Sequence, residues 1–222
     1  MNFGLSFSYV FKDPDWFKKV AIPALCSLIP VVGIFVVAGW ALKAASNVIE
    51  GNEENALPEL EFGQDLGRGF MAFLIGLIYS LIPMILAGLA GGLFGWGVDA
   101  GQALKVILYI AGGCMGLLGI LAGLVLGFLS MTAVANYVAK GEFKAAFQFK
   151  ELFGMLKKSF VSWLLVFLGA ILTMGIIAPL GGIACGIGGL LTSAYASAVF
   201  AHLLGQAYNK SHDLTFEAVE TL

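Results

Sequence analysis

The chain has 222 residues and a net charge of −2, and only 12% of its residues are charged while 59% are hydrophobic. A soluble domain carries roughly a quarter charged residues and needs them to cover its surface. With a mean hydropathy of +0.93, this composition excludes an ordinary soluble protein. The few basic residues lie beside apolar runs and form no basic stripe, which argues against nucleic acid as a partner. The sequence therefore predicts an all-α integral membrane protein.

The first apolar element is predicted to be a hairpin at 16–47, after an interfacial segment at 1–15. No charged residue interrupts Val20 to Leu42, which is long enough to cross a bilayer once. Pro30 and Gly33 lie near its centre, however, and both favour a turn. If the chain enters and returns to the same face, all but one of the basic residues fall on one side, as the positive-inside rule favours. We expect a re-entrant or short helical hairpin, with a single crossing as the alternative.

Four transmembrane helices should follow the hairpin. They are predicted from the longest runs with almost no charge, residues 70–98, 104–139, 160–183 and 186–208. The remaining segments are an acidic cytoplasmic connection at 48–69, an interfacial amphipathic helix at 141–158 and a cytoplasmic tail at 209–222. In the hairpin arrangement both termini are cytoplasmic.

Prolines and glycines mark the predicted helix breaks. Besides Pro30 and Gly33, Pro83 lies inside the second apolar run, and Pro179 precedes a glycine-rich stretch where a turn between the last two spans would fall. Broken helices expose backbone polar groups at membrane depth, and transporters bind solutes there. These breaks therefore support a channel or transporter as an alternative function.

Glycines recur at three- or four-residue intervals in the third apolar run, and such spacing places them on one helix face. They are Gly112, Gly116, Gly119, Gly123 and Gly127. A similar stripe of small residues in the last span is formed by Ser193, Ser197, Ala201 and Gly205. Small residues let two helix backbones approach closely in a membrane. The pattern predicts helix packing, either within one chain or between copies in a homo-oligomer.

His202 is the one candidate for a polar site inside a predicted span. It lies about two helical turns before Lys210, so we expect an interfacial histidine, with a proton relay as the alternative. No Ser or Cys nucleophile stands in a recognised pattern with a His and an acid, and no metalloprotease, phosphate-loop or dinucleotide motif is present in the sequence. We expect no enzyme activity, no cofactor and no metal site.

Several short strings resemble the uncharacterised prokaryotic membrane family catalogued as domain of unknown function 4013. They keep their order over nearly the whole chain and comprise Phe11 to Trp16, Lys18-Lys19, Ile29 to Gly33, Leu57 to Glu59, Ala145 to Phe147 and Ala201 to Gln206. The resemblance implies a multi-pass protein of a prokaryotic cell membrane. It implies no activity and no functional residues.

Taken together, the sequence favours a non-enzymatic membrane protein that acts by assembly or by shaping the bilayer. Its expected partners are membrane lipid and either copies of itself or a larger membrane complex. An interfacial helix and a hairpin on one side would displace lipid in one leaflet more than in the other. A small-solute channel or transporter with broken helices is the alternative.

Overall fold

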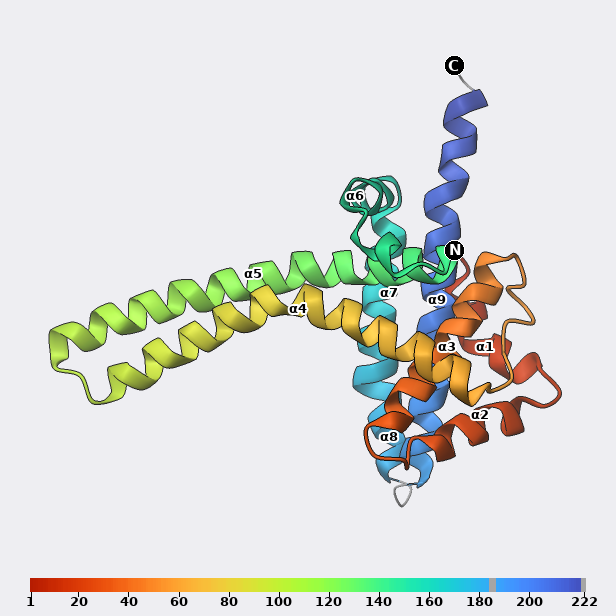
Figure 1. Ribbon diagram of the computed structural model, residues 1–222, viewed down its shortest axis with the longest axis horizontal. Helices are drawn as coiled ribbons and strands as arrows, with labels where there is room; N and C mark the ends of the chain where they lie inside the picture. Colours follow the sequence, from red (N-terminus) through yellow and green to blue (C-terminus); the bar gives the residue numbers. More distant parts are fainter. Residues whose placement is uncertain (184–186, 221–222) are drawn as a thin grey trace. The chain divides into compact units, whose positions relative to one another are not determined.

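The computed structural model describes residues 1–183 and 187–220, and in these residues every regular element is a helix (Figure 1). The chain forms two compact units. Unit 1 comprises Met1–Ile75 and Met131–Leu222, and unit 2 comprises Gly76–Ser130. Helices α4 (Phe62–Val98) and α5 (Gln102–Lys140) contribute to both units. The absence of strands in the described residues confirms the all-α class predicted from composition.

The N-terminal part of unit 1 contains three helices and the start of α4. They are α1 (Phe3–Lys12), α2 (Trp16–Cys26) and α3 (Val32–Ile49). Helix α1 begins where the side chain of Asn2 accepts a hydrogen bond from the amide of Leu5, 3.0 Å away. Helices α2 and α3 pack against each other, with only a short turn between them. This confirms the predicted helical hairpin.

The C-terminal part of unit 1 begins with the end of α5. A 3₁₀ turn η1 (Phe143–Phe147) and α6 (Phe149–Lys158) replace the single amphipathic helix predicted at 141–158. The two are separate because Gln148 leaves the helical region, with φ −80° and ψ 67°. The chain continues through α7 (Phe160–Ala170), the π-helix η2 (Ile171–Ile177), α8 (Ala178–Leu180), η3 (Gly181–Ile183) and α9 (Ile187–Glu220).

The core of unit 1 lies where α3 packs along α9. Trp40, Ala45 and Val48 of α3 are buried against this interface, together with Ala198 and Ala201 of α9. A methyl group on Gly205 of α9 would lie 2.7 Å from Val48 Cβ and 2.8 Å from the Ala45 carbonyl oxygen. The backbones therefore meet closely at Gly205, as the small-residue stripe in this segment predicted.

Unit 2 consists of the second half of α4 and the first part of α5, joined by residues 99–101. The two segments run antiparallel (Figure 1). Most of their large apolar side chains are exposed, including Ile82, Ile85, Ile107 and Ile120. A surface of this kind is stable in lipid and not in water.

Four helices in the described residues are long and apolar enough to cross a membrane: Val32–Ile49, Phe62–Val98, Gln102–Lys140 and Phe160–Leu180. The chain is thus an all-α membrane protein. The second arm of the hairpin, α3, is among the four, although the sequence assigned it to a hairpin and not to a span. The predicted span at 186–208 lies in α9 from residue 187 onward, whereas residue 186 lies outside the described residues.

Three predicted boundaries differ from the structure. Helix α4 begins at Phe62, so the connection predicted at 48–69 is shorter, and its part from Phe62 onward is helical. The same helix continues through Pro83 without a break, since the missing hydrogen bond affects a single turn of a long helix. Helix α9 extends to Glu220, so most of the tail predicted at 209–222 is helical, and residues 221–222 lie outside the described residues.

Candidate functional site

The hairpin closes through a strained turn between α2 and α3. Val31 adopts φ 66° and ψ −55°, and the Val32 amide donates to the Pro30 carbonyl at 2.7 Å, which defines a γ-turn. A branched residue rarely adopts positive φ, because its side chain crowds the backbone. Next to it, a methyl group on Gly33 would lie 2.7 Å from Ser27 Cα. Pro30 and Gly33 therefore form the helix break and the tight closure of this hairpin.

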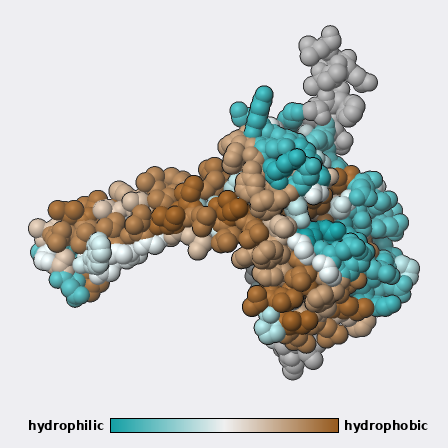
Figure 2. All heavy atoms as spheres, viewed as in Figure 1, coloured by the Kyte–Doolittle hydropathy of each residue, from teal (hydrophilic) through white to brown (hydrophobic). Residues whose placement is uncertain are grey.

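The turn exposes an uncharged apolar surface that we call the hairpin tip. Its large side chains are Leu25, Leu28, Ile29, Val31 and Ile34, with exposed fractions between 42% and 68%. Figure 2 shows this end of unit 1 as apolar, whereas hydrophilic surface covers the loop after α3. A cluster of exposed aliphatic side chains without charge is costly in water. The hairpin tip is therefore suited to contact lipid.

The opposite end of the hairpin carries the groups expected at a membrane–water boundary. Trp16 and Phe17 begin α2, are exposed and pack edge to face with a centroid distance of 5.7 Å. Lys18 is exposed beside them, and Lys19 Nζ lies 2.6 Å from Asp13 Oδ2. Aromatic rings prefer the headgroup level, and lysines extend toward lipid phosphates. The hairpin thus has a polar base and an apolar tip.

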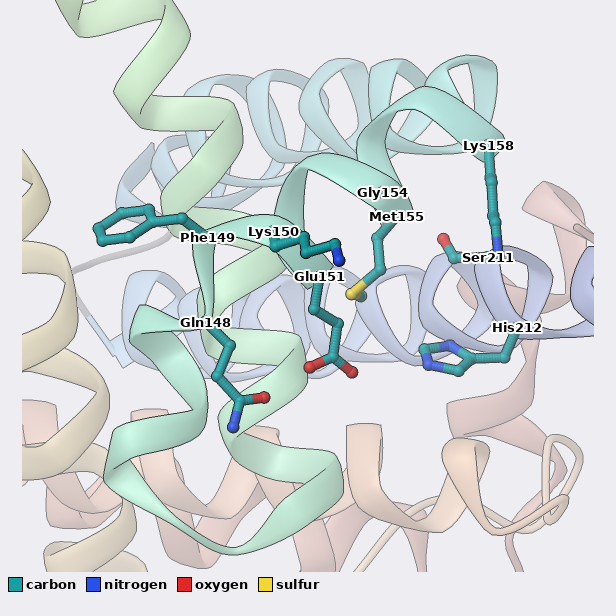
Figure 3. A pocket seen from close by; sticks show the side chains of 9 residues that line it. All are labelled: Gln148, Phe149, Lys150, Glu151, Gly154, Met155, Lys158, Ser211 and His212. Atoms are coloured by element: carbon teal, nitrogen blue, oxygen red, sulfur yellow. The ribbon is translucent and has the colours of Figure 1, made fainter.

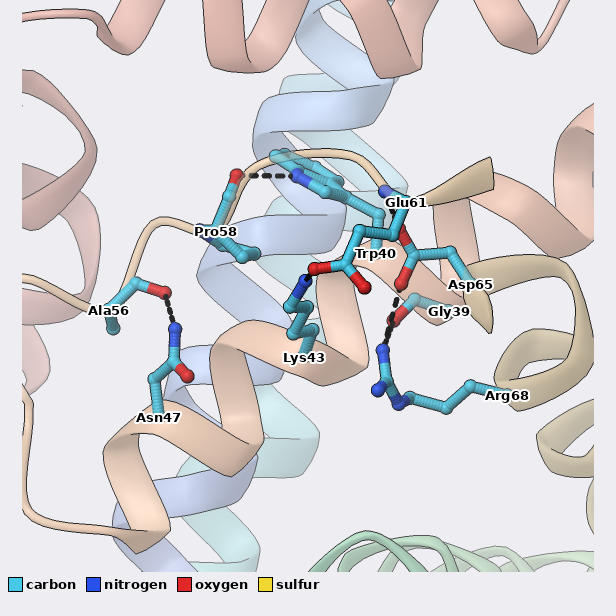
Figure 4. A network of polar contacts seen from close by, with 9 residues as sticks. All are labelled: Gly39, Trp40, Lys43, Asn47, Ala56, Pro58, Glu61, Asp65 and Arg68. Carbon is cyan, nitrogen blue, oxygen red and sulfur yellow. Dashed lines mark hydrogen bonds and ion pairs between the residues drawn. The ribbon is translucent and has the colours of Figure 1, made fainter. Parts of the chain in front are cut away.

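A network of polar contacts fixes α3 to the acidic loop and to the start of α4 (Figure 4). Lys43 forms an ion pair with Glu61, and Arg68 Nη1 lies 2.8 Å from Asp65 Oδ1. The Lys43 ammonium group lowers the pKa of Glu61 through its hydrogen bond and its charge. Trp40 Nε1 donates to the Pro58 carbonyl at 3.0 Å. The acidic stretch, predicted as a solvated connection, is therefore attached to α3 at several points.

Backbone contact at two glycines brings α3 and α4 together below this network. A methyl group on Gly39 would lie 2.6 Å from the Asp65 carbonyl carbon, and one on Gly69 would lie 2.8 Å from the Phe35 carbonyl carbon. The Gly39 carbonyl also accepts from Arg68 Nη1 at 3.3 Å. Neither glycine was among the predicted packing residues. Gly39 has no glycine three or four residues away, and Gly69 falls in the segment predicted as an acidic connection, so neither was placed in a packing stripe.

His202, which we expected to be an interfacial histidine, is fully buried within the protein. Its Nε2 lies 2.8 Å from the Glu53 carbonyl oxygen and its Nδ1 lies 2.9 Å from Ser6 Oγ. A carbonyl only accepts hydrogen bonds, so Nε2 carries the proton and Nδ1 accepts from Ser6. Gln206 completes the cluster by accepting from the Asn2 amide at 2.7 Å.

Ser6 and His202 lie within hydrogen-bonding distance of each other, and both residues are fully buried. The second ring nitrogen, Nε2, forms its hydrogen bond with the Glu53 backbone carbonyl and not with a carboxylate. The cluster joins α1, the loop after α3 and α9. Sequence reasoning missed Ser6, which lies about 200 positions from its partner.

The predicted glycines of α5 lie within unit 2 and mostly face α4. A methyl group on Gly112 would lie 3.1 Å from the ring of Phe94, and one on Gly119 would lie 3.3 Å from Leu86 Cβ. At Gly116 and Gly123 the corresponding distances, to Ala90 Cβ and Pro83 Cβ, are both 3.8 Å. A methyl group on Gly127 would meet no atom within 4 Å. The tightest approach is therefore at Gly112 and Gly119.

Pro179, the last predicted break, lies in α8 directly after the π-helix η2. The buried Thr173 in η2 donates through Oγ1 to the Gly169 carbonyl at 2.8 Å.

The described residues contain no group of three or more His, Cys, Asp or Glu side chains that could hold a metal ion.

Comparison with known proteins gives one match. The model of a family described as "Protein of unknown function (DUF4013)" matches residues 22–191. No curated protein and no solved structure matches the chain. The matched range includes the hairpin tip, the Lys43 network and α6, and it ends before His202.

Proposed function

The chain belongs to this family of unknown function, and from the geometry of its hairpin we propose that it is a non-enzymatic membrane protein that shapes the bilayer by inserting a wedge into one leaflet. The exposed apolar hairpin tip carries this proposal. Moving a tip of this kind from water into the acyl region lowers the free energy. The polar base stays at the membrane surface.

The length of α2 limits how deep the hairpin reaches. Its 11 residues span about 16 Å, roughly half of the 30 Å hydrocarbon core. Lys18, Lys19 and Trp16 at its start keep that end near the headgroups. The hairpin therefore adds volume mainly to one leaflet, and unequal volume in the two leaflets favours a curved bilayer.

The experiment that tests this function measures sorting by curvature. Fluorescently labelled protein is reconstituted into giant vesicles, and its density on the flat membrane is compared with that on narrow tubes pulled from the same vesicle. We expect density to differ between the two, and the difference to shrink in a Leu28→Ala/Val31→Ala variant. Equal density on flat and tubular membrane for the unmodified protein would refute bilayer shaping.

A matched control separates wedge volume from lost lipid contact. Leu81→Ala/Ile82→Ala removes exposed apolar atoms from α4, a predicted span that fills both leaflets. This pair should keep the curvature preference. If both pairs reduce sorting equally, the hairpin tip has no special role.

The π-helix η2 supports a second candidate function, a small-solute channel or transporter. It lies in the second half of the span Phe160–Leu180 and precedes Pro179. π-helical turns occur frequently at functional sites. Proteoliposomes placed in glycerol or urea gradients test this function by their swelling rate. Swelling above that of empty liposomes, lost in a folded Thr173→Val variant, would favour transport over shaping.

A further inference from the structure

We propose that the groove between α6 and α9 binds the phosphate of an anionic lipid headgroup. The groove has a volume of about 690 Å³, within the range of about 300–1,000 Å³ typical of ligand sites. Figure 3 shows the side chains that line it, and Glu151, Met155 and Lys158 of α6 lie on the side of Ser211 and His212 of α9. The site depends on α6 lying at the membrane surface and does not depend on bilayer curvature.

The charge in the groove is positive. Lys150 and Lys158 lie at opposite ends of α6 and both line the groove. Neither forms an ion pair with a carboxylate of the described side chains, in contrast to five other lysines, Lys12, Lys19, Lys43, Lys140 and Lys144. Uncompensated lysines near a bilayer attract anionic lipid.

Among the described side chains that line the groove, Glu151 is the acidic one, and it already has a partner. Both carboxylate oxygens of Glu151 accept from Lys140 Nζ, at 2.8 and 2.6 Å. Lys140 Nζ also donates to Gln148 Oε1 at 2.8 Å, which fixes the start of the groove. Because Lys140 balances the charge of Glu151, the two groove lysines leave a net positive charge for a ligand.

The wall formed by α9 is held by contacts within the protein and adds no negative charge from its described side chains. Ser211 Oγ accepts from Trp163 Nε1 at 3.1 Å and donates to the Ala207 carbonyl at 2.7 Å. His212 Nδ1 donates to the Tyr208 carbonyl at 3.0 Å, and its ring stacks on Tyr208 with a centroid distance of 4.1 Å. Met155 closes the bottom of the groove with an apolar surface. This wall is therefore formed before any ligand arrives.

The apolar neighbours of the groove favour a lipid over a soluble anion. Phe149 lines the groove and is half-exposed, and Phe153 and Phe160 are exposed on or beside the same helix. Such rings enter the acyl region while lysines stay at headgroup level. A bound phosphate would then be continuous with a glycerol and acyl chains that contact Phe149.

The test uses the full-length protein in non-ionic detergent, titrated separately with dioleoylphosphatidylglycerol and dioleoylphosphatidylcholine, with bound lipids counted by native mass spectrometry. We expect saturable binding of phosphatidylglycerol and weaker binding of phosphatidylcholine. A Lys150→Gln/Lys158→Gln variant should lose about tenfold or more in affinity for phosphatidylglycerol. A Lys150→Arg/Lys158→Arg variant, which keeps the charge, should bind like the unmodified protein.

Lys157 and Lys210 provide the matched control, because both are exposed, lie on the same two helices and do not line the groove. A Lys157→Gln/Lys210→Gln variant has the same change in net charge and should keep its affinity. An equal loss in both Gln pairs would show general surface attraction and overturn the site. Displacement of phosphatidylglycerol by millimolar inorganic phosphate would assign the groove to a soluble anion and overturn the lipid proposal. Because this test requires no vesicle, its failure is distinct from a failure of the curvature experiment.

Discussion

Lys12 Nζ lies 3.0 Å from Glu54 Oε1, so the segment before the hairpin touches the segment after it. A second contact joins the start of the hairpin to the loop after α3, because Lys19 Nζ donates to the Leu57 carbonyl at 3.3 Å. The exposed Lys12–Glu54 pair adds little stability. The contact matters for its geometry, because it brings the two ends of the hairpin together, which is the arrangement that the predicted re-entrant hairpin requires.

Cysteine labelling tests this arrangement. Ser8 and Asn52 are both exposed and flank the hairpin, so Ser8→Cys and Asn52→Cys, each in a background without the three native cysteines, should react with an impermeant thiol reagent from the same side. We propose that this side is cytoplasmic, in which case both sites react only after the cells are permeabilised. Labelling of the two positions from opposite sides would establish a single crossing.

His202→Phe should destabilise the protein, because it leaves the Glu53 carbonyl and the Ser6 hydroxyl buried without their partner. A lost partner of this kind costs about 1–3 kcal/mol, measurable as a lower thermal unfolding midpoint in detergent. His212→Phe is the matched control, since His212 is less buried and its Nδ1 bonds within its own helix. If both variants unfold at the same temperature as the unmodified protein, the His202 cluster does not contribute to stability.

Gly39→Ala should lower the free energy of unfolding by about 1–3 kcal/mol, because the added methyl group meets the backbone of α4 and not a movable side chain. Gly67→Ala gives the opposite expectation. Gly67 lies in α4 with nothing within 4 Å of the added methyl group, so helix propensity should raise stability by about 0.5–1 kcal/mol. The free energy of unfolding of both variants, measured by chemical or thermal unfolding, tests these two expectations. A neutral Gly39→Ala would mean that α3 and α4 are not in backbone contact.

Two glycines of unit 2 distinguish packing within a chain from packing between chains. Gly119→Leu should lower the unfolding temperature, because Leu86 lies where the new side chain would start. Gly127 is open within the described residues of one chain, so Gly127→Leu should leave the unfolding temperature unchanged. If copies pack at this face, Gly127→Leu should instead reduce the mass of the detergent-solubilised particle to that of a protomer. Light scattering after size exclusion measures that mass.

The Glu61 carboxylate gives a pH dependence of known direction. Lys43 lowers the pKa of Glu61 in the folded protein, so the folded state prefers the ionised form more than the unfolded state does. This contribution to stability is present above about pH 4.5, the ordinary pKa, and is lost as the pH falls through the lowered value. Glu61→Gln should flatten the stability profile in that acidic range. An unchanged slope would show that the Lys43–Glu61 pair does not persist in solution.

The helices and the hairpin could be predicted because their signals are local. Uncharged runs give the spans, and Pro30 with Gly33 gives the turn. The span predicted at 70–98 starts later than α4 because it was placed from the run without charged residues, and Asp65 and Arg68 lie before that run. In the structure these two side chains bond to each other, and they also bond to the Glu61 amide and to the Gly39 carbonyl of α3.

Contacts between distant segments could not be predicted from one sequence. Ser6 and His202 carry no mark of their pairing, and a histidine about two turns before a lysine is usually at the boundary. The groove between α6 and α9 likewise depends on Lys140 reaching Glu151 across a break in the helices. Local patterns report which residues prefer lipid, whereas the partner of a buried polar group depends on tertiary packing.

The His202 cluster also bears on the order of assembly during synthesis. Asn2 and Ser6 are translated about 200 residues before Gln206 and His202, their partners in α9. At 5–20 residues per second, roughly 10 to 40 seconds separate the two segments. Until α9 emerges, α1 has no partner for the polar groups it later buries. The first helix of the chain can therefore dock only after the last described helix has been made, and a ribosome stalled before residue 202 should carry an α1 that proteases can still cut.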